Sequence, residues 1–310
     1  MSERFSMKNK QVMGPMLIAA AAALWAFDGI IRRSLYTLEP IVIVFYEHLV
    51  GTVILLPTLF KTVWTDVRKI WRSLAFVSVF SGLLGTLWFT AALLAVQFIP
   101  FSVVFLLQKL QPIFAIGSAR VILKEQFSKD YLKWAALALI AAYFVTFPTG
   151  RILLAQQGNN VIAALYALGA AFGWGVSTTF SKKMLKVLPS QQSTAVRFVA
   201  TTGVTLLVLL ATLGLGGLAV PTISQWGRFI FIALSTGMVA LMIYYRGLKT
   251  TPVRVSTIME LVFPLLAVFI DAVVYRTILA PTQYAAAAVL LLAAARVAKT
   301  VENRQQVVEG

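Results

Sequence analysis

Apolar stretches of about 20 residues recur along almost the whole sequence, separated by short polar or basic segments. Coiled as an α-helix, one such stretch crosses the hydrocarbon core of a bilayer, which is about 30 Å thick. The stretches leave little sequence from which a separate water-soluble domain could form. The sequence therefore predicts an all-α, polytopic membrane protein.

The composition fits the same class of protein. Hydrophobic residues make up 59% of the chain, charged residues 12%, and the mean hydropathy is +0.85, whereas soluble domains carry about 25% charged residues. The absence of cysteine excludes disulfides, thiolate metal sites and a cysteine nucleophile. His48 is the only histidine, which leaves few ways to bind zinc, so we expect neither a metal nor another cofactor.

Charged residues, prolines and glycines divide the apolar sequence into ten predicted transmembrane helices. They lie near residues 13–35, 41–60, 74–96, 101–123, 132–148, 161–181, 194–213, 228–247, 254–275 and 281–298. Of the 27 lysines and arginines, 21 fall in cytoplasmic ends and loops, Arg197 among them, five on the outer side, Arg32 among them, and Lys109 within a span. The positive-inside rule therefore predicts a multi-pass protein of the cytoplasmic (inner) membrane with both termini in the cytoplasm.

The basic residues give a formal net charge of +16, but they lie in short clusters between apolar spans. Nucleic-acid binding usually requires one continuous basic patch, which the sequence lacks. We therefore expect the lipid bilayer and a small organic solute as partners, and no nucleic acid. The sequence leaves open whether the protein is a monomer or a homodimer.

The two halves of the chain resemble each other. A loop-like stretch from Pro148 to Asn160 divides the sequence into residues 1–150 and 151–310. Shifts of 152 and 149 positions align five pairs of residues: Gly85 with Gly237, Pro100 with Pro252, Pro112 with Pro264, Gln108 with Glu260, and Trp25 with Trp174. Each half has five predicted helices, an odd number, so the second enters the membrane from the opposite side, as in the inverted repeats of many transporters.

Three segments of the sequence carry a family resemblance. The first predicted helix contains ALWAFDGIIRRSL, residues 23–35, and helices 3 and 4 contain GLLGTLWFTAALLAVQFIPFSVVFLLQKLQPIFA, which YYRGLKTTPVRVSTIMELVFPLLAVF repeats in the second half. The chain resembles the ten-helix, EamA-type transporters of the drug/metabolite transporter superfamily. Two departures are His48, where helix 2 commonly has an arginine that matches Arg197, and KEQFS (residues 124–128), which replaces a glycine-glutamate turn. The resemblance implies secondary active transport of a small organic metabolite by alternating access.

Two ionisable residues stand out because a charge inside a bilayer costs at least about 2.5–3.5 kcal/mol on insertion scales. Lys109 and Glu260 lie well inside the fourth and ninth predicted helices, which have equivalent places in the two halves. We expect Lys109 to receive a substrate carboxylate and Glu260 an ammonium group, which favours an amino acid or another zwitterionic or amine-containing solute. The alternative is a structural ion pair that binds nothing.

The residues that follow these two charges are candidates for gating. Pro112 and Pro264 each remove a backbone donor and can bend the helix, which frees carbonyl groups to line a cavity. Asp271 lies 11 residues after Glu260, about three turns along the same helix face and nearer the exit. Asp271 either guides the substrate or pairs with a nearby arginine.

Side chains around Lys109 and Glu260 complete the predicted substrate site. Gln108 and Gln111 supply amide groups, and four aromatic residues are expected to form the apolar walls: Trp25, Tyr46, Trp88 and Tyr244. Aromatic residues in membrane proteins also commonly face lipid or the interface, which is the alternative for these four. If several surround the cavity, an organic solute with an apolar portion is favoured over an inorganic ion.

Three further residues are candidates for coupling transport to protons. Asp28 lies four residues before Arg32, so it forms either an intrahelical pair or a proton or cation site. Glu47 and His48 are adjacent and hence about 100° apart on a helix, so we expect only one of them to face the cavity. A histidine can change its charge near neutral pH, although one that merely hydrogen-bonds a neighbour is the alternative.

The sequence favours a transporter over an enzyme. It contains no G-x-x-x-x-G-K-[ST] pattern, so transport driven by ATP would require another subunit. An intramembrane enzyme would usually have clustered histidines and carboxylates, whereas this chain has one histidine and scattered acids. A membrane scaffold is the other alternative, and an organic cation or an organic acid is the alternative cargo.

Overall fold

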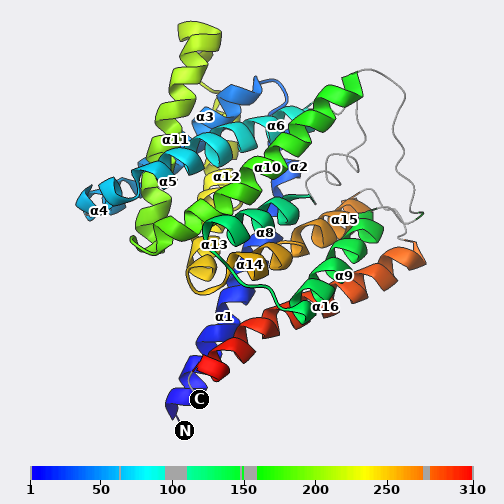
Figure 1. The fold of residues 1–310 in the computed structure, drawn as a ribbon. Helices are drawn as coiled ribbons and strands as arrows, with labels where there is room; N and C mark the ends of the chain where they lie inside the picture. The colour runs from blue at the N-terminus through cyan, green and yellow to red at the C-terminus, as the bar shows by residue number, and fades with distance from the viewer. Residues whose placement is uncertain are drawn as a thin grey trace.

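A computed structural model describes residues 2–62, 64–94, 110–146, 149, 159–274 and 280–308, and these residues form helices and no strand (Figure 1). The helices of the first half are α1 (Ser2–Trp25), α2 (Asp28–Arg33), α3 (Pro40–Phe60), α4 (Trp64–Lys69), α5 (Trp71–Phe76), the π-helix η1 (Val77–Gly85), α6 (Thr86–Leu94), α8 (Gln111–Ile122) and α9 (Lys129–Thr146). Those of the second half are α10 (Asn159–Leu185), α11 (Ser190–Leu213), the 3-10 helix η2 (Gly214–Leu218), α12 (Ile223–Leu234), α13 (Met238–Thr250), α14 (Val253–Met259), α15 (Val262–Val274) and α16 (Pro281–Val308).

Many large apolar side chains lie on the outer surface, which is expected where lipid replaces water. In the described part of the chain, four helical segments are long and apolar enough to cross a bilayer: Pro40–Phe60, Trp71–Ala91, Ser190–Leu218 and Ile223–Thr250. Val121, Leu207 and Val273 expose 78%, 69% and 77% of their surface. Large exposed apolar areas are rare on soluble monomers. The protein is therefore a multi-pass, helical membrane protein, while the number of ten spans remains a prediction.

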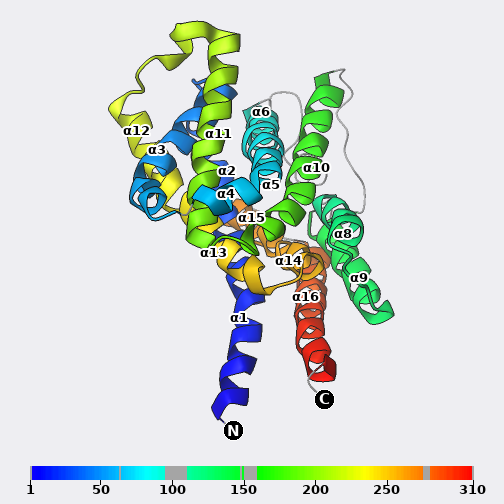
Figure 2. The same cartoon turned by 60° about the vertical axis from the view of Figure 1, so that its left-hand side comes forward.

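The helices pack mainly as pairs that are distant in sequence. α16 packs along α9, α1 along α13, and α3 along α11. Small residues allow the first of these contacts to be close, since Ala138, Ala142 and Ala293 are completely buried between α9 and α16. In both views, α1 and α16 project from the same end of the molecule, where the two termini lie (Figures 1 and 2).

Among the residues that the structure describes, three of the predicted spans are interrupted. The first is broken at residues 26–27, between α1 and α2; the eighth at residues 235–237, between α12 and α13; and the ninth at residues 260–261, between α14 and α15. In the ninth span the main-chain carbonyl of Glu260 bonds the amide of Phe263, because Pro264 lacks the N–H that an α-helix would offer it. Irregular backbone at membrane depth is tolerated where it lines a cavity inside the protein.

The third predicted span is continuous but changes its helical form. It runs through α5, η1 and α6, and its π-helical part lies against α10. A Cβ atom added at Gly173 of α10 would lie 2.3 Å from the main-chain oxygen of Phe80 in η1. Only glycine therefore permits the two backbones to approach this closely.

The corner between α13 and α14 is fixed by two charged side chains. Lys182 Nζ donates to the carbonyl oxygens of Leu248, Lys249 and Thr251 over 2.5, 3.0 and 2.8 Å, at the end of α13. Glu125 accepts from the amide nitrogens of Val253 and Arg254 at 2.9 and 3.2 Å, at the start of α14. Each charge has the sign that complements the dipole of its helix end.

The departure from the glycine-glutamate turn has a structural consequence. Lys124 has a φ of 56°, the left-handed conformation that glycine adopts without a steric penalty. This conformation turns the chain after α8 and brings Glu125 to the α13–α14 corner.

Candidate functional site

A cavity lies where the interrupted spans meet. It is lined by residues of α1, α2, α3, η1, α6, α8, α10, α11, α13, α14 and α15 and of the breaks between them. Pro112, at the start of α8, lines the cavity. So do seven of the residues proposed from the sequence for binding or coupling: Trp25, Asp28, Glu47, His48, Gln111, Tyr244 and Glu260.

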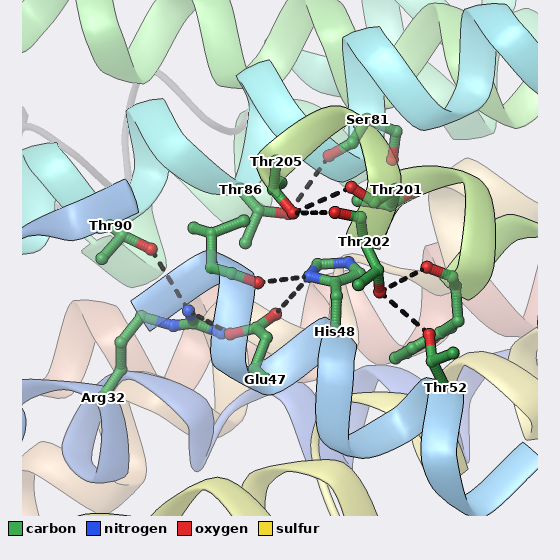
Figure 3. A network of polar contacts seen from close by, with 12 residues as sticks. Arg32, Glu47, His48, Thr52, Ser81, Thr86, Thr90, Thr201, Thr202 and Thr205 are labelled. Carbon is green, nitrogen blue, oxygen red and sulfur yellow. Dashed lines mark hydrogen bonds and ion pairs between the residues drawn. The ribbon is translucent and has the colours of Figure 1, made fainter. Parts of the chain in front are cut away.

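One wall of the cavity holds a buried cluster of three charged side chains. Arg32 Nε is 2.8 Å from Asp28 Oδ2. Arg32 Nη1 is 2.5 Å from Glu47 Oε2 (Figure 3). Arg32 Nη1 also donates to Thr90 Oγ1 over 3.2 Å. The cluster joins α2, α3 and α6, and it contains one carboxyl group more than guanidinium groups.

Glu47 and His48 both line the cavity, so the expectation that only one of them would face it is wrong. The two side chains also contact each other, since Glu47 Oε1 is 3.6 Å from His48 Nδ1 (Figure 3). Glu47 binds Arg32 through its other oxygen, and the ring of His48 lies on Phe198 with a centroid distance of 5.0 Å. His48 Nδ1 is 2.8 Å from the carbonyl oxygen of Val44. The angle of about 100° between neighbouring residues of a helix therefore does not prevent both side chains from lining the cavity.

Glu260 lies at the break of the ninth span and is held by three neutral donors. Tyr244 Oη donates to Glu260 Oε1 over 2.7 Å, Ser256 Oγ donates to the same oxygen over 3.2 Å, and Gln111 Nε2 donates to Oε2 over 2.7 Å. In the described part of the chain no cation lies within ion-pair distance of this carboxyl group. The group is thus positioned by α8, α13 and α14 with its charge unpaired by these residues.

Arg197 reaches the cavity from α11, although its place in the charge count predicts a cytoplasmic position. Its Nη1 donates to Tyr245 Oη over 2.9 Å and its Nη2 to Ser81 Oγ over 2.7 Å. The helix begins at Ser190, so Arg197 lies two turns inside it, and its position toward the cytoplasm remains a prediction. The internal repeat could have identified Arg197 as a cavity residue, since Arg197 aligns with His48 of the first half.

Several polar atoms on the cavity wall are buried without a hydrogen-bond partner among the residues that the structure describes. They are Ser177 Oγ, Thr257 Oγ1 and Arg197 Nε. Nearly all buried polar groups in proteins are hydrogen-bonded, so unpaired groups in residues that line one cavity are candidates for ligand contacts. Sequence patterns do not single out Ser177 or Thr257, because serine and threonine are common in membrane helices.

Aromatic rings supply the apolar part of the lining. The Trp25 and Tyr244 rings have a centroid distance of 5.2 Å, and Phe89 and Trp174 are 5.2 Å apart in an edge-on arrangement. Trp174 Nε1 donates to the carbonyl oxygen of Ser81 over 3.2 Å, which fixes the indole against η1. Flat apolar surface and unpaired polar groups therefore occur together in this cavity.

Two predicted aromatic residues lie elsewhere. Tyr46 is buried among Trp226 and Phe229 on the other side of α3, and its hydroxyl donates to the carbonyl oxygens of residues 218 and 219. Trp88 packs beside Gly169 of α10. In both cases the next residue along the helix, Glu47 or Phe89, lines the cavity instead.

Some predicted residues fall outside the described part of the chain. Lys109 and Gln108 are among them, so the pairing of Lys109 with Glu260 remains a prediction. Asp271 and Pro264 belong to α15, but their side chains are outside the described part as well. Among the residues that the structure describes, no three histidine or acidic side chains form a group that could hold a metal ion.

The chain is similar to known proteins along nearly its whole length. The model of the EamA-like transporter family matches residues 12–147 and, a second time, residues 161–298. The riboflavin transporter ImpX of Fusobacterium nucleatum subsp. nucleatum is 35% identical over 296 residues, which cover 94% of this chain and 99% of the relative. A protein of known crystal structure superposes with a TM-score of 0.72 over 92% of this chain and 97% of its own; at 16% identity this similarity shows a common fold alone.

Proposed function

The chain belongs to the EamA-like transporter family, and we propose that it carries riboflavin, or a similar planar heterocycle with a polyhydroxylated tail, across the membrane. Membership of the family makes it a small-molecule transporter of the drug/metabolite transporter type and not an enzyme. The choice of solute is carried by one observation, the 35% identity along nearly the whole of both chains with a relative named a riboflavin transporter.

The lining of the cavity supports a solute of this shape. A flavin ring is flat and apolar on both faces, and Trp25, Phe89 and Trp174 offer flat aromatic surface at the cavity. The ribityl tail carries hydroxyl groups, and Ser177 and Thr257 offer buried hydroxyls that lack a partner in the described residues. Glu260 adds a carboxylate that can accept hydrogen bonds from an N–H or a hydroxyl group of the solute.

Alternating access is the mechanism that we propose. The twofold match of the family model supports a division into residues 1–150 and 151–310, and the predicted repeat makes these halves inverted. The cavity has a volume of about 210 Å³, whereas pockets that enclose drug-sized ligands span roughly 300–1,000 Å³. The broken spans therefore have to move apart when the solute binds, with Pro112, Pro264 and Asp271 as the proposed gate. The charge distribution favours the inner membrane with cytoplasmic termini.

Coupling to protons is part of this proposal. The residues proposed for it are Asp28, Glu47 and His48, which line one cavity. Arg32 bridges the two acids, so a proton that binds to one of them changes how this arginine is held. Proton binding is thereby linked, through Arg32, to the conformation of the broken first span.

A second candidate is an amino acid or another zwitterion. The observation that favours it is the presence of opposite charges in one cavity, Arg197 and Glu260, neither of which forms an ion pair within the described residues. A carboxylate on Arg197 and an ammonium group on Glu260 would satisfy both. Lys109 remains the other proposed partner for the carboxylate.

Counterflow in proteoliposomes distinguishes the candidates. Vesicles are loaded with unlabelled riboflavin, and entry of tritiated riboflavin is followed against protein-free vesicles and against the same assay with amino acids, organic cations and organic acids. We expect counterflow of riboflavin alone. Counterflow of an amino acid without riboflavin would overturn the first proposal in favour of the second.

The hydroxyl contacts can be tested in the same vesicles. Ser177→Ala and Thr257→Val should each weaken riboflavin binding by roughly 3- to 10-fold, the effect of one lost hydrogen bond. Lumiflavin, which lacks the ribityl tail, should bind to both variants as it does to the parent protein. Ser78→Ala is the matched control, because Ser78 Oγ is also buried and unpaired but lies away from the cavity.

A further inference from the structure

Arg197 is fixed in the wall of the cavity from two sides. Ser81 of η1 accepts from its Nη2, and Tyr245 of α13 accepts from its Nη1. Tyr245 is itself held in place, since its hydroxyl is 3.0 Å from Ser181 Oγ of α10. The guanidinium group therefore has a defined position between three helical segments.

The same side chain keeps hydrogen-bonding capacity that the described residues do not use. Arg197 Nε is buried and has no partner, and no carboxylate of the described residues lies within ion-pair distance of the group. Arg32, the other guanidinium at the cavity, differs in this respect because it contacts both Asp28 and Glu47. Arg197 as a whole is partly buried, and a cation at a cavity that has no counter-charge among the described residues favours a ligand that completes its contacts.

The charges of the cavity indicate which kind of acceptor this ligand offers. Among the described residues, the lining contains three carboxyl groups, those of Asp28, Glu47 and Glu260, and two guanidinium groups, those of Arg32 and Arg197. This balance disfavours a cargo with a phosphate or several carboxylates. It leaves neutral, strongly polar acceptors, and a carbonyl oxygen beside an unprotonated ring nitrogen offers two adjacent acceptors to the planar fork of a guanidinium group.

We infer that Arg197 is the specificity-determining residue that binds a carbonyl oxygen at the pyrimidine end of the flavin ring, together with the unprotonated ring nitrogen beside it. The inference rests on the proposed function, since it assigns a role toward that solute. The aromatic rings then enclose the body of the heterocycle, and the unpaired hydroxyls of Ser177 and Thr257 are left for its tail. The site thereby selects flavins by their ring carbonyls and not by charge.

The test compares Arg197 variants with riboflavin analogues whose ring carbonyl oxygens are replaced one at a time by sulfur, a weaker acceptor. Binding is measured by competition with tritiated riboflavin on the purified full-length protein. The parent protein should bind 2-thioriboflavin or 4-thioriboflavin at least about 10-fold more weakly than riboflavin. Arg197→Gln should weaken riboflavin binding by roughly 10- to 100-fold and remove the discrimination between oxygen and sulfur.

Two further variants keep the result interpretable. Arg197→Lys retains the charge but not the planar fork, so it should lose most of the discrimination even if Arg197→Gln does not fold. Arg246→Gln is the matched control, because Arg246 lies on the exposed face of the same α13 that carries Tyr245, and it should behave like the parent protein.

The outcomes separate this inference from the proposed function. If the parent protein binds no flavin, the proposed function fails and this inference fails with it. If flavin binds and the folded Arg197 variants discriminate between oxygen and sulfur as the parent does, the proposed function stands and the role of Arg197 is overturned. Equal affinity of the parent for riboflavin and both thio analogues overturns it too.

Discussion

Thr236 Oγ1 donates a hydrogen bond to Asp28 Oδ1 over 2.6 Å, and this bond joins the interruptions of two predicted spans that lie 208 residues apart. Asp28 follows the break between α1 and α2, and Thr236 lies in the break between α12 and α13. The second oxygen of the same carboxylate contacts Arg32. One buried acid thus connects the broken ends of both spans to the charged cluster at the cavity.

Removal of this connection should loosen both breaks. Thr236→Val keeps the volume of the side chain but leaves Asp28 with one donor fewer, which should lower the free energy of unfolding by about 1–3 kcal/mol. The change is measured by denaturant titration of the purified protein in detergent. Thr212→Val is the control, because Thr212 is exposed and bonds only to its own helix. Equal stability of the two variants would show that the bond contributes nothing.

Neutralisation of Arg32 should lower the free energy of unfolding by more than Thr236→Val does. Arg32→Gln leaves Asp28 and Glu47 buried without their cation, and loss of one partner of a buried ion pair typically costs about 3–5 kcal/mol. Lys69→Gln removes the cation of an exposed pair with Asp66 and should cost no more than about 1 kcal/mol. Thermal unfolding of the two variants side by side checks the difference, and a smaller loss for Arg32→Gln would contradict the structural role of the cluster.

The close approach of α10 and η1 predicts that replacement of two helical glycines by alanine changes the stability in opposite directions. Gly173→Ala places a methyl group against the main-chain oxygen of Phe80, so it should be destabilising and reduce transport. Gly203→Ala in α11 meets nothing within 4 Å and should stabilise the protein by about 0.5–1 kcal/mol, because alanine favours the helix. Unfolding titrations of both variants decide the point. Stabilisation by Gly173→Ala would mean that the two backbones are farther apart.

The left-handed residue after α8 predicts a stabilising substitution. Lys124→Gly relieves the conformational penalty of a side chain at positive φ and should raise the free energy of unfolding by up to about 1 kcal/mol. Lys133→Gly is the opposite control, because Lys133 is exposed in the interior of α9, where glycine costs about 1 kcal/mol relative to good helix formers. Destabilisation by both changes would mean that Lys124 does not adopt this backbone conformation.

The proposed coupling residues can be separated from the solute site by the driving force of transport. Glu47→Gln keeps an oxygen that can accept from Arg32 but cannot carry a proton. Uptake driven by an imposed pH gradient should therefore be lost, whereas counterflow, which needs no net proton movement, should continue. Asp66→Asn, a change of the same kind at an exposed position, should affect neither. Gradient-driven uptake that survives Glu47→Gln would exclude Glu47 from coupling.

Local chemistry explains which site residues could be predicted. Asp28, Glu47 and Glu260 stand out in the sequence because a carboxyl group in an apolar stretch is costly wherever it points, and all three line the cavity. The apolar stretches likewise predict helices without knowledge of their partners, and most of the described helices overlap the predicted ranges, whereas α4 and η2 lie outside them. Both signals are properties of a short window of sequence.

By itself, the sequence determined that the chain is helical, enters a bilayer and has the pattern of its family. Only the tertiary structure decided that Arg197 faces the cavity while Tyr46 and Trp88 turn away from it, and that Ser177 and Thr257 carry unpaired hydroxyls there. These features depend on which helices lie side by side, and on contacts such as that of Asp28 with Thr236 across 208 residues. Burial of a side chain is a property of all the segments around it, whereas the cost of a charge in lipid is a property of that residue alone.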